Sequence, residues 1–226
     1  MIKYDCILLA AGEGQRAALG YNKVLYKIGS KKEIVRYSLE YFINDEQCEK
    51  IVLVINERDK YYFENLLKEY ESKKIEYTYG GANRGDSVYQ GLKLTDGDYV
   101  IVHDSARPLV YKEDVYNLLN NATETGGATL ATKVYNTTCH MIDGYVDEYF
   151  SRHTLASLIT PQCFKASTLL KAYHKARVEG INYTDDTGIF KAYGGNVRLV
   201  FTDNVSIKAT TAYDIKFLEA ILDASR

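Results

Sequence analysis

The sequence predicts an α/β protein built on a Rossmann-like, mostly parallel sheet from which a β-hairpin projects. Apolar, β-branched runs alternate with helix-like stretches, as in Ile51–Ile55 followed by 57–71. An Asp143-Gly144 pair between alternating polar and apolar residues is a strong hairpin signal. The 226 residues suffice for one α/β domain, and 46% hydrophobic with 26% charged residues is ordinary globular composition.

The elements follow one another in the order that such a sheet requires. The first strand contains the apolar run Ile7–Ala10, and the later strand Tyr99–His103 precedes a helix over 112–121. Continuous apolar strands are typical of a sheet whose two faces are both covered by helices. A helix, a strand and a final helix are expected at 166–179, 197–201 and 212–223.

We therefore expect a single domain over residues 1–226, with the hairpin as an arm at about 135–152. Because a lone hairpin is marginally stable in water, the arm is expected to pack against something, such as a second subunit.

Charge and cysteine content exclude several classes of function. The formal net charge is -2, so there is no general basic field of the kind that holds nucleic acid. The four cysteines form no CxxC pair, which suits a reducing cytoplasm, and the four histidines show no metal-ligand spacing. No apolar run approaches the length that spans a membrane. We expect a cytoplasmic protein that binds neither nucleic acid nor a membrane.

A glycine-rich segment directly follows the first strand, and Arg16 and Lys23 come shortly after it. Small residues let backbone amides approach a phosphate or a base, and the two cations could neutralise a triphosphate. The segment does not match the Walker motif, and the acidic residue that completes a dinucleotide fingerprint is missing. On these residues alone, a nucleotide loop and an ordinary strand-to-helix turn are equally open.

Six motifs occur in a characteristic order along the chain. They are AAGEGQR at 10–16 with Lys23, GGANRGDSV at 80–88, HDSARP at 103–108, TPQCF at 160–164, TDD at 184–186 and NVSIKAT at 204–210. This ordered set resembles the 2-C-methyl-D-erythritol 4-phosphate cytidylyltransferase family of sugar-phosphate nucleotidyltransferases, and it spans nearly the whole chain.

The resemblance implies a GT-A-like nucleotidyltransferase fold and an enzyme that transfers CMP from CTP to a polyol phosphate. The acceptor implied is 2-C-methyl-D-erythritol 4-phosphate, with release of pyrophosphate, in isoprenoid precursor synthesis. Both partners are anions, so catalysis would rest on charge neutralisation and positioning, with Mg²⁺ or another divalent cation as cofactor.

The resemblance also assigns residues to the nucleotide. Three cations, Arg16, Lys23 and Lys208, are the expected catalytic residues. The nucleotide would be bound by Ala10, Ala11, Gly12, Glu13 and Gly14 of the first loop and by Gly81, Ala82, Arg84 and Ser87 near the base. Simpler interpretations stay open, with Lys208 as a solvated lysine, Ser87 as a helix-capping hydroxyl and Arg84 ordering its loop.

The acceptor would be bound by Asp104, Arg107, Thr137, Arg152, Thr160 and Thr184. Asp104 follows a strand at the carboxyl edge, where open α/β sheets bind ligands, and its carboxylate suits a metal ion held together with phosphate oxygens. An Asp104–Arg107 salt bridge is the structural alternative. Arg152 is expected to reach the neighbouring subunit's substrate, which implies a homodimer; a solvated arm residue is the competing interpretation.

Three residues depart from the family pattern. Asn22 replaces a proline before Lys23, Ala82 replaces a frequent acidic residue, and Asn136 replaces an aspartate before Thr137. These departures, with serine in HDSARP, leave ribitol 5-phosphate cytidylyltransferase, which serves wall or capsule polymers, as an alternative. A non-catalytic nucleotide-binding regulatory module is the alternative of another class, and turnover of CTP would distinguish it.

Overall fold

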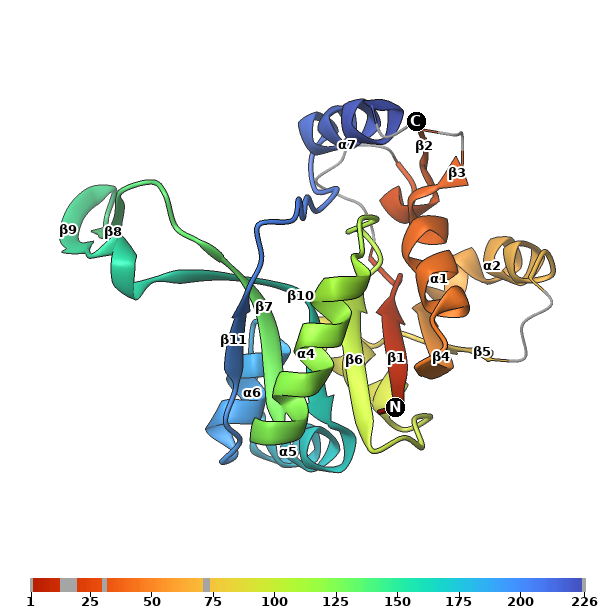
Figure 1. Ribbon diagram of the computed structural model, residues 1–226, viewed down its shortest axis with the longest axis horizontal. Coiled ribbons are helices and arrows are strands. Elements are labelled where there is room, and N and C mark those ends of the chain that lie inside the picture. Colours follow the sequence, from red (N-terminus) through yellow and green to blue (C-terminus); the bar gives the residue numbers. More distant parts are fainter. Residues whose placement is uncertain (1, 13–19, 30–31, 71–73, 225–226) are drawn as a thin grey trace.

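The computed structural model describes residues 2–12, 20–29, 32–70 and 74–224 (Figure 1). Its centre is a seven-stranded sheet in the order β11-β7-β10-β6-β1-β4-β5. The strands are β1 (Tyr4–Leu9), β4 (Cys48–Ile55), β5 (Ile75–Tyr79), β6 (Tyr99–Asp104), β7 (Gly127–Lys133), β10 (Ala156–Lys165) and β11 (Arg198–Phe201). β10 runs antiparallel to both of its neighbours, and all other pairs in this sheet are parallel. The predicted α/β class with a mostly parallel sheet is confirmed.

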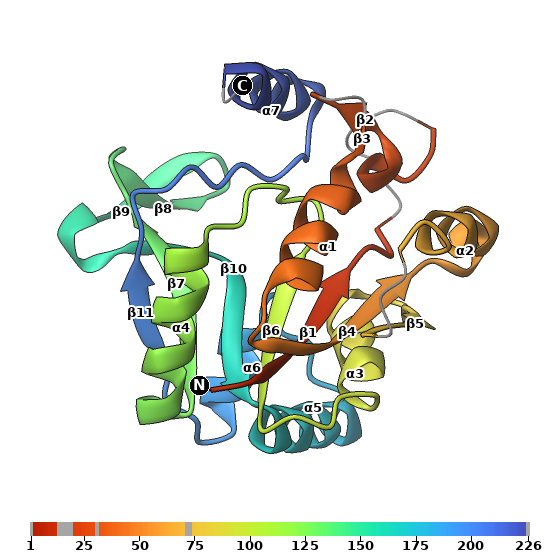
Figure 2. The same cartoon turned by 45° about the vertical axis from the view of Figure 1, so that its right-hand side comes forward.

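Helices cover both faces of this sheet, and Figure 2 shows two of them, α1 and α4, in front of it. One face packs against α1 (Ile34–Asn44), α2 (Lys60–Leu67) and α4 (Lys112–Thr125), and the other against α3 (Arg84–Leu92), α5 (Ala166–Glu179) and α6 (Asp186–Ala192). Alternate strand residues enter the two cores: Cys6 and Leu8 of β1 belong to the first and Ile7 to the second. Both faces are therefore apolar, which explains the unbroken hydrophobic runs.

The helix expected over 57–71 is shorter than predicted. A 3₁₀ turn, Glu57–Asp59, precedes α2, which ends at Leu67. Asn56 caps the turn, because its side chain accepts a hydrogen bond from the backbone N–H of Arg58.

A small third cluster lies beyond the carboxyl end of β1 (Figure 1). It joins the short strands β2 (Lys27–Ile28) and β3 (Lys32–Glu33), the start of α1, and the C-terminal helix α7 (Ala212–Ala224). Its buried members are Ile28, Ile34, Ala209, Ile215 and Leu218. The segment before α7 is thereby attached to the edge of the sheet where ligands are expected.

The predicted hairpin is present and projects from the body (Figure 1). It consists of β8 (Thr138–Ile142) and β9 (Tyr145–Phe150), joined at Asp143-Gly144. Both turn residues have positive φ, 50° and 84°, as a type I′ hairpin turn requires. The arm exposes large apolar side chains, including Tyr145 at 79% and Tyr149 at 69%. Its role as a dimerisation arm stays a prediction.

Candidate active site

A cavity of about 390 Å³ lies where β1, β5 and β6 end. The chain builds β4 and β5 on one side of β1 and then places β6 on the other, so the cavity sits at a topological switch point. Among the sequence-predicted site residues, those that line it are Ala11, Gly12, Lys23, Gly81, Ala82, Arg84, Ser87, Asp104 and Lys208. Asn56 and Asn83 also line it and were not predicted.

Asp104 is the buried carboxylate of this cavity, at the end of β6. One oxygen accepts a hydrogen bond from Lys208 Nζ at 2.6 Å, and the other from Arg84 Nε at 3.3 Å. Burial raises the pKa of Asp104, but the two cations outweigh it and hold that pKa well below its ordinary value. Asp104 is therefore an ionised group that gathers two cations at the cavity wall.

Arg84 is fixed by a second carboxylate that the site prediction omitted. Its Nη2 donates to Asp186 Oδ2 at 2.8 Å, and Tyr173 Oη donates to Asp186 Oδ1 at 2.5 Å. Asp186 is fully buried at the start of α6, and Tyr173 belongs to α5. The TDD motif contains this aspartate, so the signal was there, but the motif gives no hint that Arg84 is its partner.

The loop between β5 and α3 is shaped by close contacts. Gly81 N donates to Ser87 Oγ at 3.2 Å, and that hydroxyl donates to Asn83 O at 3.0 Å. Asn83 caps α3, accepting from Asp86 N at 2.8 Å. A side chain on Gly81 would collide with Asp86, so glycine is required there for the chain to turn. Ser87 thus orders the loop and also lines the cavity.

Asn22, which replaces the family proline, holds the Lys23 segment in another way. Its fully buried side chain donates to Ala10 O at 2.7 Å and to Asp59 Oδ2 at 2.9 Å. Its Oδ1 accepts from Val24 N at 3.3 Å, which caps a short 3₁₀ turn, Lys23–Leu25. Hydrogen bonds here supply the rigidity that a proline ring would provide, and they place Lys23 beside the end of β1.

The Lys208 segment is attached to the loop after β6. Ala209 N donates to Ala106 O at 2.8 Å, and Arg107 Nη1 donates to the Ser206 carbonyl at 3.0 Å. Arg107 therefore pairs with this segment, and the Asp104–Arg107 salt bridge that the sequence left open is not formed. Ala209 is buried in the third cluster while Lys208 reaches Asp104.

Two neighbours of Asp104 face the interior. His103 is fully buried, its Nε2 lies 2.9 Å from Arg107 O, and burial lowers its pKa to about 4, so it is neutral near pH 7. Ser105 Oγ donates to Leu9 O at 2.5 Å and is likewise buried. The side chain of the serine in HDSARP therefore bonds to the backbone of β1 and does not line the cavity.

The remaining predicted residues are placed differently. Ala10 is buried behind the cavity, and Thr160 Oγ1 accepts from the backbone N–H of Asp104 at 3.1 Å. Thr137, Arg152 and Thr184 are exposed and do not line the cavity, the first two because they lie at the base of the arm. Glu13, Gly14 and Arg16 lie outside the described residues.

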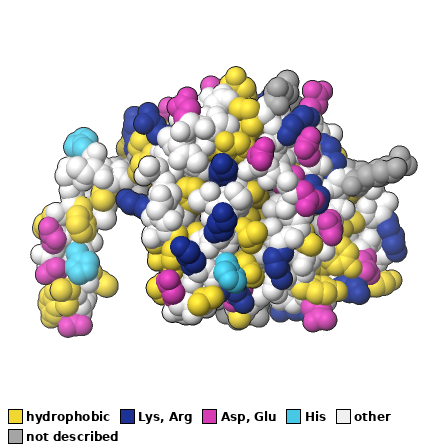
Figure 3. Space-filling view, turned by 90° about the horizontal axis from the view of Figure 1, so that it is seen from below, with side chains coloured by type: hydrophobic (Ala, Val, Ile, Leu, Met, Phe, Trp, Pro, Cys, Tyr) yellow, Lys and Arg dark blue, Asp and Glu magenta, His cyan; other side chains and the backbone are white. Residues whose placement is uncertain are grey.

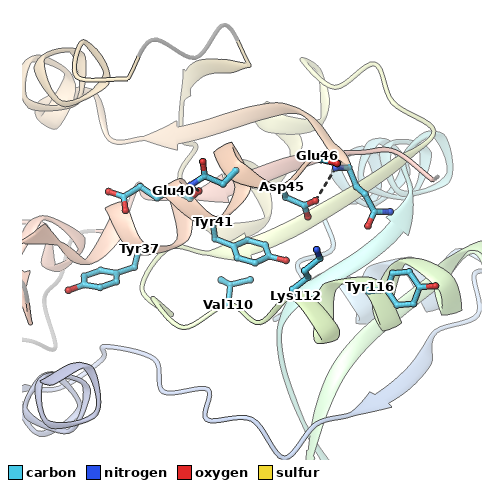
Figure 4. A pocket seen from close by; sticks show the side chains of 10 residues that line it. Tyr37, Glu40, Tyr41, Asp45, Glu46, Val110, Lys112 and Tyr116 are labelled. Carbon is cyan, nitrogen blue, oxygen red and sulfur yellow. Dashed lines mark hydrogen bonds between the residues drawn. The ribbon is translucent and has the colours of Figure 1, made fainter. Parts of the chain in front are cut away.

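A larger cavity of about 680 Å³ lies elsewhere, between α1 and α4 (Figure 4). Its lining includes Tyr41, Val110 and Lys112 and none of the predicted site residues. In the described ranges no three His, Cys, Asp or Glu side chains form a metal cluster. No helix in the described part of the chain is long and apolar enough to cross a membrane.

The fold and the cation-lined cavity are those of a nucleotidyltransferase. The sequence matches the family model of 2-C-methyl-D-erythritol 4-phosphate cytidylyltransferase (IspD) over residues 5–224, and the chain belongs to this family. It is 38% identical over 228 residues to the enzyme of that name from Geobacillus thermodenitrificans, with 100% of this chain and 99% of the relative covered. The corresponding enzyme from Bacillus licheniformis is 36% identical, with 100% and 98% covered.

Solved structures agree with this assignment. A 4-diphosphocytidyl-2C-methyl-D-erythritol synthase from Anaerococcus prevotii superposes with a TM-score of 0.86 at 27% identity, covering 98% of this chain and 96% of the other. The cytidylyltransferase from Francisella tularensis gives 0.83 at 26% identity, covering 96% and 99%. The family predicted from the six motifs is confirmed.

Proposed function

We propose that the chain transfers CMP from CTP to 2-C-methyl-D-erythritol 4-phosphate and releases pyrophosphate. The observation that carries this proposal is the pairing of Arg84 and Lys208 with the carboxylate of Asp104, in a cavity that Lys23 also lines, at the switch point of the sheet. The names of the relatives supply the identity of the nucleotide and of the acceptor.

In the proposed reaction, an oxygen of the acceptor phosphate attacks the α-phosphorus of CTP. A new P–O bond forms, the bond to the β-phosphate oxygen breaks, and pyrophosphate leaves with the electron pair. Lys208 stabilises the negative charge that develops at the α-phosphate, and Lys23 holds the triphosphate, together with Arg16. Gly81 and Ser87 bind the base, and no covalent intermediate is required.

The donor set suits a divalent cation. Mg²⁺ is commonly held by one or two carboxylates together with substrate phosphates, and Asp104 is the carboxylate that lines this cavity. Asp104 would hold the ion with phosphate oxygens, exchanging part of its contact with Arg84 or Lys208. When bound, the ion would neutralise phosphate charge and leave the positioning to the side chains.

The acceptor side would be completed by a second copy of the chain. Arg107 and Thr160 lie near Asp104, whereas Thr137 and Arg152 lie at the base of the arm. We propose that the exposed apolar arm pairs with its counterpart in a homodimer, so that Thr137 and Arg152 reach the partner's acceptor phosphate. Thr184 is assigned to the acceptor on its motif alone.

The substrate is tested by pyrophosphate release from CTP with Mg²⁺ and either 2-C-methyl-D-erythritol 4-phosphate or ribitol 5-phosphate. Release with the first acceptor alone supports the proposal. Release with the second alone would identify ribitol 5-phosphate as the acceptor instead. Absence of release with both acceptors, while CTP still binds, would instead support a regulatory nucleotide-binding module.

The dimer is tested by mixing two inactive variants, Arg152→Ala and Lys208→Ala. If Arg152 acts across the interface, mixed dimers contain one site with both residues intact, and activity reappears on mixing. If Arg152 acts within its own subunit, the mixture stays inactive. Sedimentation of the separate variants controls for loss of assembly.

We also propose a cytosolic location. All four cysteines are free thiols, and Cys6, Cys48 and Cys163 are buried and unpaired. Unpaired thiols are typical of proteins kept in a reducing compartment.

A further inference from the structure

A third hollow, a groove of about 500 Å³, lies between α3, α5 and the end of α6, on the helical face away from the catalytic cavity. Its floor is formed by Tyr89, Leu170, Ala172 and Tyr193, and its rim by Lys93, Lys171, His174 and Lys175. We call this the cationic groove. Figure 3 shows the molecule from below, where Lys and Arg side chains gather around a histidine beside bare hydrophobic surface.

The rim carries an unbalanced positive charge. No Asp or Glu lines the groove, and Lys93, Lys171 and Lys175 form no ion pair with any residue in the described ranges. The chain as a whole has a net charge of -2, so the excess is local. Lys171 and Lys175 are four apart on α5, where two like charges destabilise a helix by about 0.2–0.5 kcal/mol.

The floor presents mainly aromatic and aliphatic surface, and Thr168 adds a hydroxyl to the lining. The Tyr89 ring has the Arg177 guanidinium 4.8 Å from its centroid and Lys93 Nζ at 5.6 Å. Arg177 also forms an ion pair with Asp86, which fixes the guanidinium over the Tyr89 ring. The Tyr193 ring is held by its hydroxyl, which donates to Glu179. An occupant would meet apolar surface below it and ammonium groups around it.

We propose that the cationic groove binds a small organic phosphate, with its apolar body on the tyrosine floor and its phosphate held by Lys171, Lys175 and Lys93. A phosphate group complements several ammonium donors that have no acidic partner, and an apolar body removes the floor from water. A purely inorganic anion would leave the floor exposed, and an uncharged apolar compound would leave the lysines unpaired.

The groove is placed to act on nucleotide binding. α3, which contributes Tyr89 to the floor, begins with the Arg84 and Ser87 of the catalytic cavity. α5, which contributes the rim, carries Tyr173, whose hydroxyl fixes the Asp186 that holds Arg84. A ligand that bridges α3 and α5 therefore acts as an effector, and its binding and that of CTP must influence each other equally.

The test is isothermal titration of the full chain with phenyl phosphate as the probe, with the catalytic cavity saturated by CTP. Inorganic phosphate and phenol are titrated in parallel. We expect phenyl phosphate to bind more tightly than either, and the double variant K171Q/K175Q to weaken it about tenfold, a loss of about 1.4 kcal/mol. A matched control, K112Q/K133Q, removes two exposed lysines outside the groove and should leave the affinity unchanged.

A second readout locates the probe. The ring resonances of His174 should shift on titration, whereas those of His140 and His153, on the arm, should not. Equal affinity in K171Q/K175Q and wild type, equal affinity for inorganic phosphate, or a silent His174 would each overturn the site. An unchanged CTP dissociation constant at saturating probe would overturn the effector role. Since binding is measured without turnover, the test of the site does not depend on the proposed reaction, whereas the test of the effector role rests on the binding of CTP in the proposed function.

Discussion

Replacing Asp186 by asparagine tests whether this buried carboxylate holds Arg84 in the active site. Removing one partner of a buried ion pair costs about 3–5 kcal/mol. Two features reduce this cost. Arg84 is 28% exposed and keeps Asp104 as a partner at 3.3 Å, and the asparagine can still accept a hydrogen bond from Tyr173. We therefore expect a loss of unfolding free energy below that range, about 2–3 kcal/mol. The KM for CTP should rise as well, because Arg84 lines the cavity.

The assay is urea unfolding followed by far-UV circular dichroism. With an m-value of about 2–3 kcal/mol/M, the expected loss shifts the midpoint by roughly 1 M. Tyr173→Phe removes only a hydrogen bond to a charged group and should cost about 1.5–2 kcal/mol. The double variant should cost less than the sum of the two, because both changes affect one carboxylate. Unfolding free energies within about 0.5 kcal/mol of wild type for Asp186→Asn would refute the reasoning.

Three further predictions concern the catalytic cavity. Lys208→Met should lower kcat by about 10²–10³-fold without a comparable loss of stability, measured by pyrophosphate release; a change in KM alone would argue against a role at the α-phosphate. Asn22→Ala should cost about 2–3 kcal/mol in urea unfolding and raise the KM for CTP, because the Ala10 carbonyl and Asp59 lose their buried donor. The lowered pKa of Asp104 adds stability that is fully present above the ordinary value near 3.9 and disappears as the pH falls toward the lowered value. Asp104→Asn should therefore flatten the acid limb of the stability curve, and an unchanged limb would show that this carboxylate is not stabilised in the fold.

Much of the architecture could be predicted because the strands alternate with helices and carry unbroken apolar runs. The helix Ala166–Glu179 appears at the predicted bounds, and β11 and α7 differ from prediction by a residue. β10 escaped notice because ASLITPQCFK mixes polar and apolar residues and contains a proline. Its antiparallel direction follows from the arm, which carries the chain out from β7 and back, and no local pattern encodes that.

The site was predicted less completely than the fold. The motifs identified Lys23, Asp104 and Lys208, because each lies in or next to a short segment whose sequence is recognisable. Motifs do not encode pairing between distant segments, so the role of Asp186, 102 positions after Arg84, appeared only in three dimensions. The sequence shows Asn22 only as a departure from the family proline, whereas in the structure its amide makes contacts that a proline could not.

Two parts of the fold that differ in local stability contribute to the active site: the third cluster and the main sheet. Ile207 and Ala209, on either side of Lys208, pack with α7 and β2, whereas Asp104 belongs to the strands of the main sheet. A cluster with few buried apolar side chains opens at a lower free energy than a large core. Partial opening would withdraw the lysine while the sheet stayed folded, so enzymatic activity should vanish at a lower urea concentration than helical signal. Loss of activity would then measure local unfolding of the third cluster. Assays of turnover would underestimate the fraction of the chain that is still folded.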